Sequence, residues 1–264
     1  MKIINKNIES LGYQLSDDGK PQAIARLLDA CGLAKVEADG RAESNRCLVA
    51  ETPAGGLAAM VAWSLYGDGR AVIHSLSVAP SSRGIGIGAS MVASAMIALR
   101  EDAGVEAIYV GVHRGLKRYF GRLGFEAVPE GGALPPTVAE NPTIVGPETV
   151  VMSRDYGATR RGLDQCAFIL RCNSTAGATL PTGSVFWFRQ RDEVVEAQYR
   201  GGRVRRGHML GALDSDSIRF SWHACDDRGG LQRGQGRINV EVLEDGRREL
   251  REVMDVGELI LREI

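Results

Sequence analysis

The chain has 264 residues and a formal net charge of −1 at pH 7. Since domains average roughly 100 to 200 residues, this length favours two domains. The near-zero charge provides no electrostatic attraction toward nucleic acid or an anionic membrane, and we expect neither as a partner. A local basic cluster, which we interpret as a solvated strand edge, is formed by Arg200, Arg203, Arg205 and Arg206.

The five cysteines show no CxxC pair and no spacing typical of metal ligands, so we expect neither a disulfide framework nor a metal site. The first ten residues, MKIINKNIES, lack the apolar segment of a signal peptide, and no apolar run approaches the ~18 residues of a membrane-spanning helix. These features predict a soluble, cytoplasmic protein with buried, inert cysteines. A redox or arsenical-binding thiol is the alternative.

Residues 1–155 alternate between helical and strand periods. Pro21 suits the first turn of a helix, and Gly32 suits its end. Interleaved helices and strands predict an α/β or α+β domain around a central sheet. The apolar spacing predicts helices over 21–33, 90–99 and 116–123, and strands over 46–51, 56–65, 71–78, 106–112 and 150–152.

Residues 166–264 show no helical period, and the polar stretch 156–165 before them is predicted to be a linker. Gly-Gly or Asp-Gly pairs separate several short strand patterns, which is typical of antiparallel strands joined by tight turns. This half therefore predicts an all-β, antiparallel, barrel-like domain or a sandwich. The predicted strands are 167–172, 184–189, 194–199, 205–213, 217–223, 236–243 and 249–254.

The stretch from Ser75 to Ser90 carries the most informative chemistry. A strand runs into Pro80, a loop with Arg83 and three glycines follows, and a helix comes next. Glycines let main-chain amides turn toward an anion, and the start of a helix adds unpaired amides and a positive dipole end. Arg83 adds a fixed positive charge. The stretch predicts a pyrophosphate site.

Three other interpretations of this loop are weaker. A P-loop requires Lys and then Ser or Thr after its last glycine, whereas Gly88 is followed by Ala89 and Ser90. A dinucleotide-binding loop requires an acid at the end of the next strand, and the strand 106–112 runs into His113 instead. A glycine-rich turn without a ligand is the third alternative.

The pattern Val78-Ala79-Pro80-x-x-Arg83-Gly84-x-Gly86-x-Gly88 resembles the acetyl-CoA motif of the GNAT superfamily of N-acetyltransferases. The run Tyr-Phe-Gly-Arg-Leu-Gly-Phe at 119–125 resembles the family's late helix. Strand 108–112 lies where the family has a strand that parts from its neighbour to admit the thioester. The resemblance covers residues 8–154 and implies an α+β domain, a mixed sheet with helices on both faces, with acetyl-CoA as cosubstrate. The implied coenzyme-binding residues are Leu76, Ser77, Val78, Arg83, Gly84, Ile85, Gly86, Ile87, Gly88 and Ala89.

Within the superfamily, the first domain looks most like the arsenic-resistance group of N-acetyltransferases. The stretches 27–34 and 133–155 carry this likeness. Those relatives often have Cys-Pro in the second stretch, where this chain has Gly146-Pro147. This departure speaks against the handling of arsenic itself.

In this superfamily an amine attacks the thioester directly while both substrates are bound. The resemblance implies that main-chain amides around Leu76 to Val78 polarise the carbonyl. Strand alternation places His74 on the face of Leu76 and Val78, and imidazole titrates near neutral pH, so His74 is the candidate base. Phe120 occupies the family's usual tyrosine position, which leaves the adjacent Tyr119 as the candidate acid. A packed histidine and a core aromatic are the alternatives.

Residues 166–264 resemble a family of small standalone β-barrels, calycin-like in outline, whose members are often labelled N-acetylglutamate synthase. The matching residues are mostly turn glycines and core residues, among them Trp222 and the pair Gly201-Gly202. Small barrels can hold a ligand. Arg189, Glu196 and His208 could line such a cup, but we interpret them as facing solvent.

The sequence therefore predicts an N-acetyltransferase that acts on the amine of a small molecule, with a homodimer as one option. A non-catalytic acyl-CoA sensor is an alternative, motivated by Phe120. A glutamate N-acetyltransferase is another, motivated by the relatives of the barrel. We expect the acceptor to be selected by the first helix, the loop after it and the tail 135–147.

Overall fold

The computed structural model describes residues 5–33, 42–141, 143–146, 148–156, 162–174, 179–254 and 257–264. It divides into two compact units. We call the first, which contains residues 12–158, the sheet unit, and the second, which contains residues 5–11 and 159–264, the barrel unit. Residues 157–161 of the expected linker lie outside the described part of the chain. No helix in the described ranges is long and apolar enough to cross a membrane.

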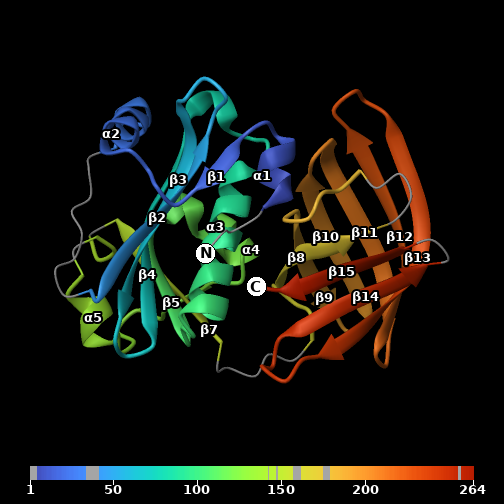
Figure 1. The fold of residues 1–264 in the computed structure, drawn as a ribbon. Helices are drawn as coiled ribbons and strands as arrows, with labels where there is room; N and C mark the ends of the chain where they lie inside the picture. Colours follow the sequence, from blue (N-terminus) through green and yellow to red (C-terminus); the bar gives the residue numbers. More distant parts are fainter. Residues whose placement is uncertain are drawn as a thin grey trace. The chain divides into compact units, whose positions relative to one another are not determined.

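The sheet unit is built on a seven-stranded mixed sheet with the order β1-β2-β3-β4-β5-β7-β6 (Figure 1). Neighbouring strands are antiparallel except β4 and β5, which run parallel. The strands are β1 Gln14–Ser16, β2 Ser44–Glu51, β3 Leu57–Tyr66, β4 Arg70–Val78, β5 Ala107–His113, β6 Glu126–Ala127 and β7 Thr149–Asp155.

Helices cover both faces of this sheet, as Figure 1 shows for α2 and α3. The α2 residues Leu27 and Leu28 pack with Val49, Met60 and Ala62 of the sheet in one apolar cluster. The predicted α+β fold is confirmed. The helical segments are α2 Pro21–Ala30, η1 Pro80–Ser82, α3 Ile87–Ile97, η2 Ala98–Asp102, η3 Arg114–Leu116, α4 Lys117–Arg122 and α5 Pro136–Ala139.

Helix α3, which corresponds to the helix predicted over 90–99, is buried on nearly every side. Ile87, Met91, Val92 and Met96 are each exposed by 1% or less. A helix that is apolar all round belongs in the interior, and the small residues of α3 let it lie close to its neighbours. It begins at Ile87, three residues before the predicted start, because Gly86 caps it in the left-handed conformation (φ 93°).

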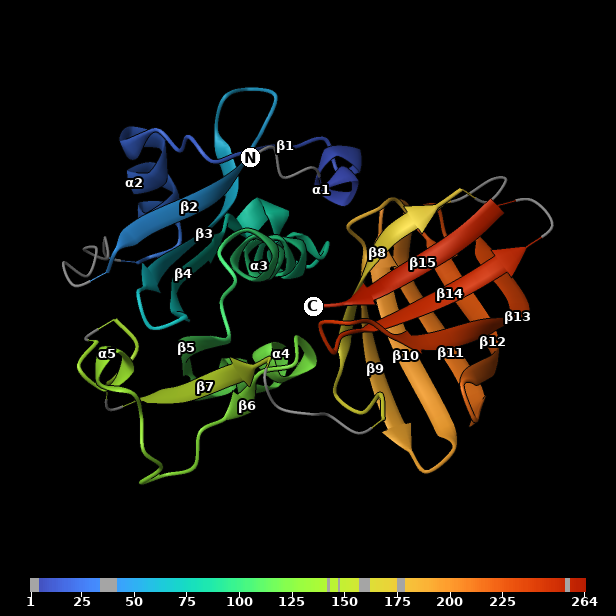
Figure 2. The ribbon, with the colours of Figure 1, turned by 60° about the horizontal axis from the view of Figure 1, so that its bottom comes forward.

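The barrel unit is a closed barrel of eight strands, each antiparallel to its neighbours (Figure 2). This confirms the predicted antiparallel barrel and adds an eighth strand, β15, which the sequence did not predict. The bounds are β8 Ala167–Asn173, β9 Val185–Arg191, β10 Val194–Gly201, β11 Val204–Asp214, β12 Ser217–Asp226, β13 Leu231–Val242, β14 Arg248–Met254 and β15 Gly257–Glu263.

The barrel unit buries a core of apolar side chains and one ion pair. Phe168, Phe188 and Leu250 are each exposed by 1% or less. The guanidinium of Arg248 donates to both carboxylate oxygens of Glu263, at 2.8 Å each. Two buried charges are tolerated because each satisfies the other with several hydrogen bonds.

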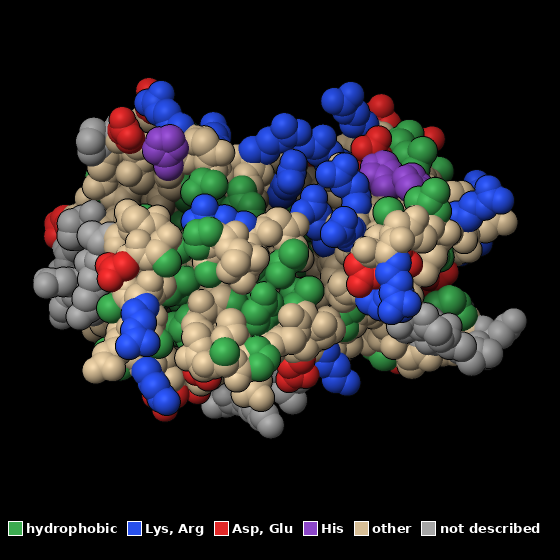
Figure 3. Space-filling view, turned by 90° about the horizontal axis from the view of Figure 1, so that it is seen from above, with side chains coloured by type: hydrophobic (Ala, Val, Ile, Leu, Met, Phe, Trp, Pro, Cys, Tyr) green, Lys and Arg blue, Asp and Glu red, His purple; other side chains and the backbone are tan. Residues whose placement is uncertain are grey.

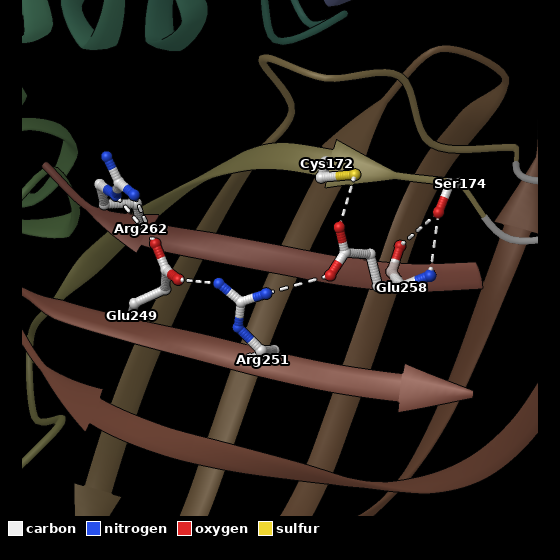
Figure 4. Close-up of polar contacts among 6 residues, drawn as sticks. All are labelled: Cys172, Ser174, Glu249, Arg251, Glu258 and Arg262. Atoms are coloured by element: carbon white, nitrogen blue, oxygen red, sulfur yellow. Dashed lines mark hydrogen bonds and ion pairs between the residues drawn. The ribbon is translucent and has the colours of Figure 1, made fainter.

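A chain of ion pairs joins β14 and β15 on the outside of the barrel (Figure 4). Arg251 lies between Glu249 and Glu258, with nitrogen–oxygen distances of 2.8 and 3.1 Å, and Arg262 donates to the other oxygen of Glu249. Burial alone would raise the pKa of Glu249, but the hydrogen bonds from Arg262 and Arg251 outweigh it and lower the pKa. The network therefore keeps Glu249 ionised where these strands meet.

Helix α1, Lys6–Ser10, belongs to the barrel unit although it precedes the sheet unit in the chain. The main-chain amide of Asn7 donates to the carbonyl of Thr182 (2.8 Å), and the Asn7 side chain accepts from the amide of Gly202 (2.9 Å). Ile8 is fully buried. The barrel unit thus includes a short segment from the range 1–155 that was expected to form the first domain.

Candidate functional site

The sheet opens between β4 and β5. Their parallel pairing runs from Arg70–Ala107 to Ile73–Val110 and ends there. Strand β4 stays paired with β3 as far as Val78, and β5 stays paired with β7 as far as His113. Beyond this point β4 and β5 are no longer paired with each other, so the edges that face each other have no partner strand. This is the parting of strands that the resemblance implied.

The loop after β4 presents main-chain amides to solvent. Gly84 and Gly86 adopt positive φ values of 81° and 93°, which are favourable for glycine and strained for other residues. Ser90 donates to the carbonyl of Gly86 (3.2 Å). The amides from Ile85 to Ala89 donate to no other atom of the described chain. These amides, three of them in the first turn of α3, can bind an anion.

Arg83 and Cys31 both contact the end of β4. Arg83 Nε donates to the carbonyl of Val78 (3.1 Å), and the Cys31 thiol approaches the same oxygen at 3.4 Å. The Arg83 side chain is exposed. Its guanidinium is therefore anchored at one nitrogen beside the loop of free amides, where it adds positive charge.

His74 lies at a β-bulge, and this changes the face that was expected for it. Ala62 of β3 pairs with Ser75 while Trp63 pairs with Ile73, so His74 is an extra residue in β4. His74 Nδ1 lies 3.2 Å from Ser75 Oγ. Successive side chains of a regular strand point to opposite faces and cannot make this contact.

The expectation that His74 shares the face of Leu76 and Val78 is therefore wrong. Ser75 pairs with Ala62, which packs against α2, whereas Leu76 pairs with Val61 on the other face. The bulge brings His74 to the side of Ser75 and α2. The face cannot be predicted here from strict alternation along the strand, because one unpaired residue shifts the side chains before it to the opposite face of the sheet.

The His74 imidazole has one nitrogen without a partner. Nε2 is buried and makes no hydrogen bond to the described residues. Burial lowers the pKa of His74, because desolvation disfavours the charged imidazolium. Ser77, two residues after Ser75 on the same face, has a buried hydroxyl that likewise lacks a partner in the described chain.

Tyr119 places its hydroxyl at the start of α3. A Cβ atom added to Gly88 would lie 3.1 Å from Tyr119 Oη and 3.3 Å from Val78 Cγ2. The hydroxyl is buried without a hydrogen-bond partner among the described residues, and burial raises its pKa far above the ordinary value. The neighbouring Phe120 is instead a core residue that packs edge-on against Phe125. Of the two residues, Tyr119 carries the polar group that reaches the loop.

On the sheet face that carries α2, helix α5 and the segment after it pack over the end of β3 and over β5. Asn141 donates to the Tyr66 hydroxyl (2.9 Å), and Val138 and Ile144 pack with Tyr66 and Val72. Gly111 lets the main chain of Ile144 pass directly over β5, since a Cβ atom there would overlap it. The loop 34–41 and Pro147, also expected on the acceptor side, lie outside the described residues.

In the barrel unit, the polar residues considered for a ligand cup point outward. Arg189 and Glu196 are exposed, and His208 lies beside His223 on the neighbouring strand, with ring centroids 5.5 Å apart. Basic side chains gather on the face drawn in Figure 3, and the exposed arginines of the barrel include Arg205 and Arg206. The described ranges contain no group of three or more His, Cys, Asp or Glu residues that could hold a metal ion.

Two family models match the chain, one within each unit. Residues 13–125 match the acetyltransferase (GNAT) family, and residues 161–258 match the avidin-like protein family. No curated protein matches the chain.

Solved structures resemble about half of the chain. An acetyltransferase of the GNAT family from Staphylococcus aureus is 12% identical, covers 54% of this chain and 98% of its own, and has a TM-score of 0.44. An acetyltransferase from Streptococcus agalactiae is 13% identical, with 55% and 98% covered and a TM-score of 0.43. N-acetylglutamate synthase from Neisseria gonorrhoeae, complexed with coenzyme A and N-acetyl-glutamate, is 17% identical, with 54% and 35% covered and a TM-score of 0.43.

We predict that Gly86→Ala weakens the binding of coenzyme A about tenfold. Placing a Cβ at this left-handed position costs about 1–2 kcal/mol, and relief of the strain would turn the free amides away from their common direction. Isothermal titration calorimetry with coenzyme A measures the effect. Gly121→Ala is the matched control, because Gly121 lies in α4 with open space around it. Equal affinities of the two variants would contradict a role for these amides.

Proposed function

We propose that the domain that contains residues 13–125, which match the acetyltransferase (GNAT) family, transfers an acetyl group from acetyl-CoA to the amine of a small molecule. The avidin-like match at residues 161–258 lies in the barrel unit. The row of free amides from Ile85 to Ala89 is the observation that carries this proposal. Together with Arg83 and the start of α3, these amides fit the pyrophosphate of the coenzyme. The narrower likeness to the arsenic-resistance group stays a prediction.

The open edge of β4 supports the placement of the thioester. Beyond Ile73 this edge has no partner strand, so we propose that main-chain groups between Leu76 and Val78 bind the pantetheine arm and the acetyl carbonyl, apart from the Val78 carbonyl, which accepts from Arg83. The position of Tyr119 Oη beside Gly88 agrees with this path, since the thioester would run from the loop toward the opening. Leu76, Ser77 and Val78 are therefore proposed to contact the coenzyme through their main chain.

The proposed reaction is a direct transfer. The amine nitrogen forms a bond to the acetyl carbon, the carbon–sulfur bond breaks, and the amine loses a proton. We propose that His74 Nε2, a buried nitrogen without a hydrogen-bond partner among the described residues, takes this proton. The sulfur leaves as the thiolate of coenzyme A.

Tyr119 is proposed to assist the leaving thiolate. A thiol has a pKa of roughly 8.5, whereas burial holds the pKa of Tyr119 far above that value. Complete proton transfer from the tyrosine is therefore unfavourable, and a hydrogen bond from Oη to the sulfur is the favoured interaction. This contact would spare the thiolate a fully desolvated charge.

A non-catalytic acyl-CoA sensor is the alternative. The Tyr119 hydroxyl beside Gly88 supports an enzyme instead, because it offers the hydroxyl group that Phe120 lacks. The direct test is mass spectrometry of small-amine mixtures, glutamate among them, after incubation with acetyl-CoA and the full chain. We expect at least one acetylated amine. Coenzyme A binding by calorimetry with no acetylated amine would favour the sensor, and glutamate as the one product would favour a glutamate N-acetyltransferase.

We predict that His74→Gln lowers kcat about 100-fold and removes the acidic limb of the pH profile. The neutral imidazole is the active form, and its lowered pKa means that wild-type kcat/KM falls only as pH drops below about 6.5. Steady-state rates from pH 5 to 9 measure this. If His74→Gln keeps the acidic limb of the wild-type profile, another group is the base.

We predict that Tyr119→Phe lowers kcat about tenfold yet raises stability. The wild-type hydroxyl is buried without a partner, and such a group costs about 1–3 kcal/mol. Its removal should raise the free energy of unfolding by about 1 kcal/mol. Urea unfolding and steady-state kinetics test both parts. A slower but less stable variant would mean that the hydroxyl is a structural group with a hidden partner.

A further inference from the structure

The contact between His74 and Ser75 bears on which imidazole nitrogen carries the proton. Nδ1 lies 3.2 Å from Ser75 Oγ, and Nε2 has no partner in the described chain. A neutral imidazole carries one proton, and the hydrogen bond of one nitrogen fixes the state of the other. A serine hydroxyl can donate or accept, so the contact allows two arrangements.

The two arrangements differ in the chemistry that they leave at Nε2. If Nδ1–H donates to Ser75 Oγ, Nε2 keeps a free lone pair and can accept a proton. If Ser75 donates to Nδ1, Nε2 carries the proton and can act only as a donor. A base requires the first arrangement.

We propose that Ser75 is a positioning residue that accepts a hydrogen bond from His74 Nδ1–H and so leaves Nε2 of His74 free as the proton acceptor. This rests on the proposed acetyl transfer. The bulge is the device that makes the contact, because a regular strand would place Ser75 on the opposite face from His74. Ser75 thereby acts on the reaction through His74.

Among the described residues, Ser75 is the one side chain that contacts the imidazole through a hydrogen bond. In the described part of the chain, no carboxylate contacts the ring as in a triad, and burial is the cause of its pKa shift. Ser77, on the same face, has a hydroxyl without a partner and does not reach the ring. The protonation site of His74 therefore depends on a single neutral contact.

Nitrogen NMR of the full chain with 15N-labelled histidine tests this directly. The chain has four histidines, and the signal that disappears in His74→Gln identifies His74. We expect wild-type His74 to be protonated at Nδ1 and bare at Nε2 at pH 8. Ser75→Ala should shift this population toward the Nε2-protonated form. Ser153→Ala, a serine on β7 of the same sheet, is the control and should leave the signal unchanged.

Kinetics give the second readout. Ser75→Ala should lower kcat at least about tenfold with the KM for acetyl-CoA unchanged, and Ser75→Thr, which keeps the hydroxyl, should restore most of it. A His74 protonated at Nε2 in the wild type, or unaffected by Ser75→Ala, overturns the proposal. If the wild type acetylates no amine, the proposed function fails, while the NMR result still decides the role of Ser75.

Discussion

The early end of the pairing between β4 and β5 is the constraint on which the proposed site depends. Past Ile73 and Val110 each strand keeps one neighbour and loses the other. Main-chain groups at a sheet edge need partners, and a folded protein usually covers such an edge. Here the uncovered edge of β4 leads straight into the loop at Arg83. A ligand with amide groups and phosphates could supply partners along this whole length.

The start of α3 extends this constraint to the helix. Its first amides have no partner in the described chain, and no side chain caps them. A helix start that lacks a cap is unfavourable unless water or a ligand satisfies it. The rest of α3 is anchored by near-complete burial, so the helix can tolerate an uncapped end. The buried body of α3 thus stabilises the interior, while its first turn keeps main-chain amides available for a ligand.

Much of this could be predicted from the sequence, because the signals are local. The glycine spacing after Val78 indicated the turn and the free amides, and the change from helical to strand periods separated the two halves. The bulge at His74 could not be predicted, since AVIHSLSV contains no glycine or proline and reads as a regular strand. Helix α1 also escaped prediction, because its stability comes from contacts with Thr182 and Gly202 far along the chain. The domain boundaries at 155 and 165 stay predictions.

Three buried polar atoms that lack a hydrogen-bond partner in the described part of the chain lie on or beside β4 and the start of α3: His74 Nε2, Ser77 Oγ and Tyr119 Oη. Each such atom costs roughly 1–3 kcal/mol, so their presence in one neighbourhood is a substantial local penalty. An apolar residue at each position would remove it, as Phe120 shows by packing into the core next to Tyr119. Polar groups that stay unsatisfied along a strand with an open edge fit a site whose partners arrive with the substrate. In this chain the bulge is what turns His74 into that group, since a regular strand would have directed its imidazole to the other face.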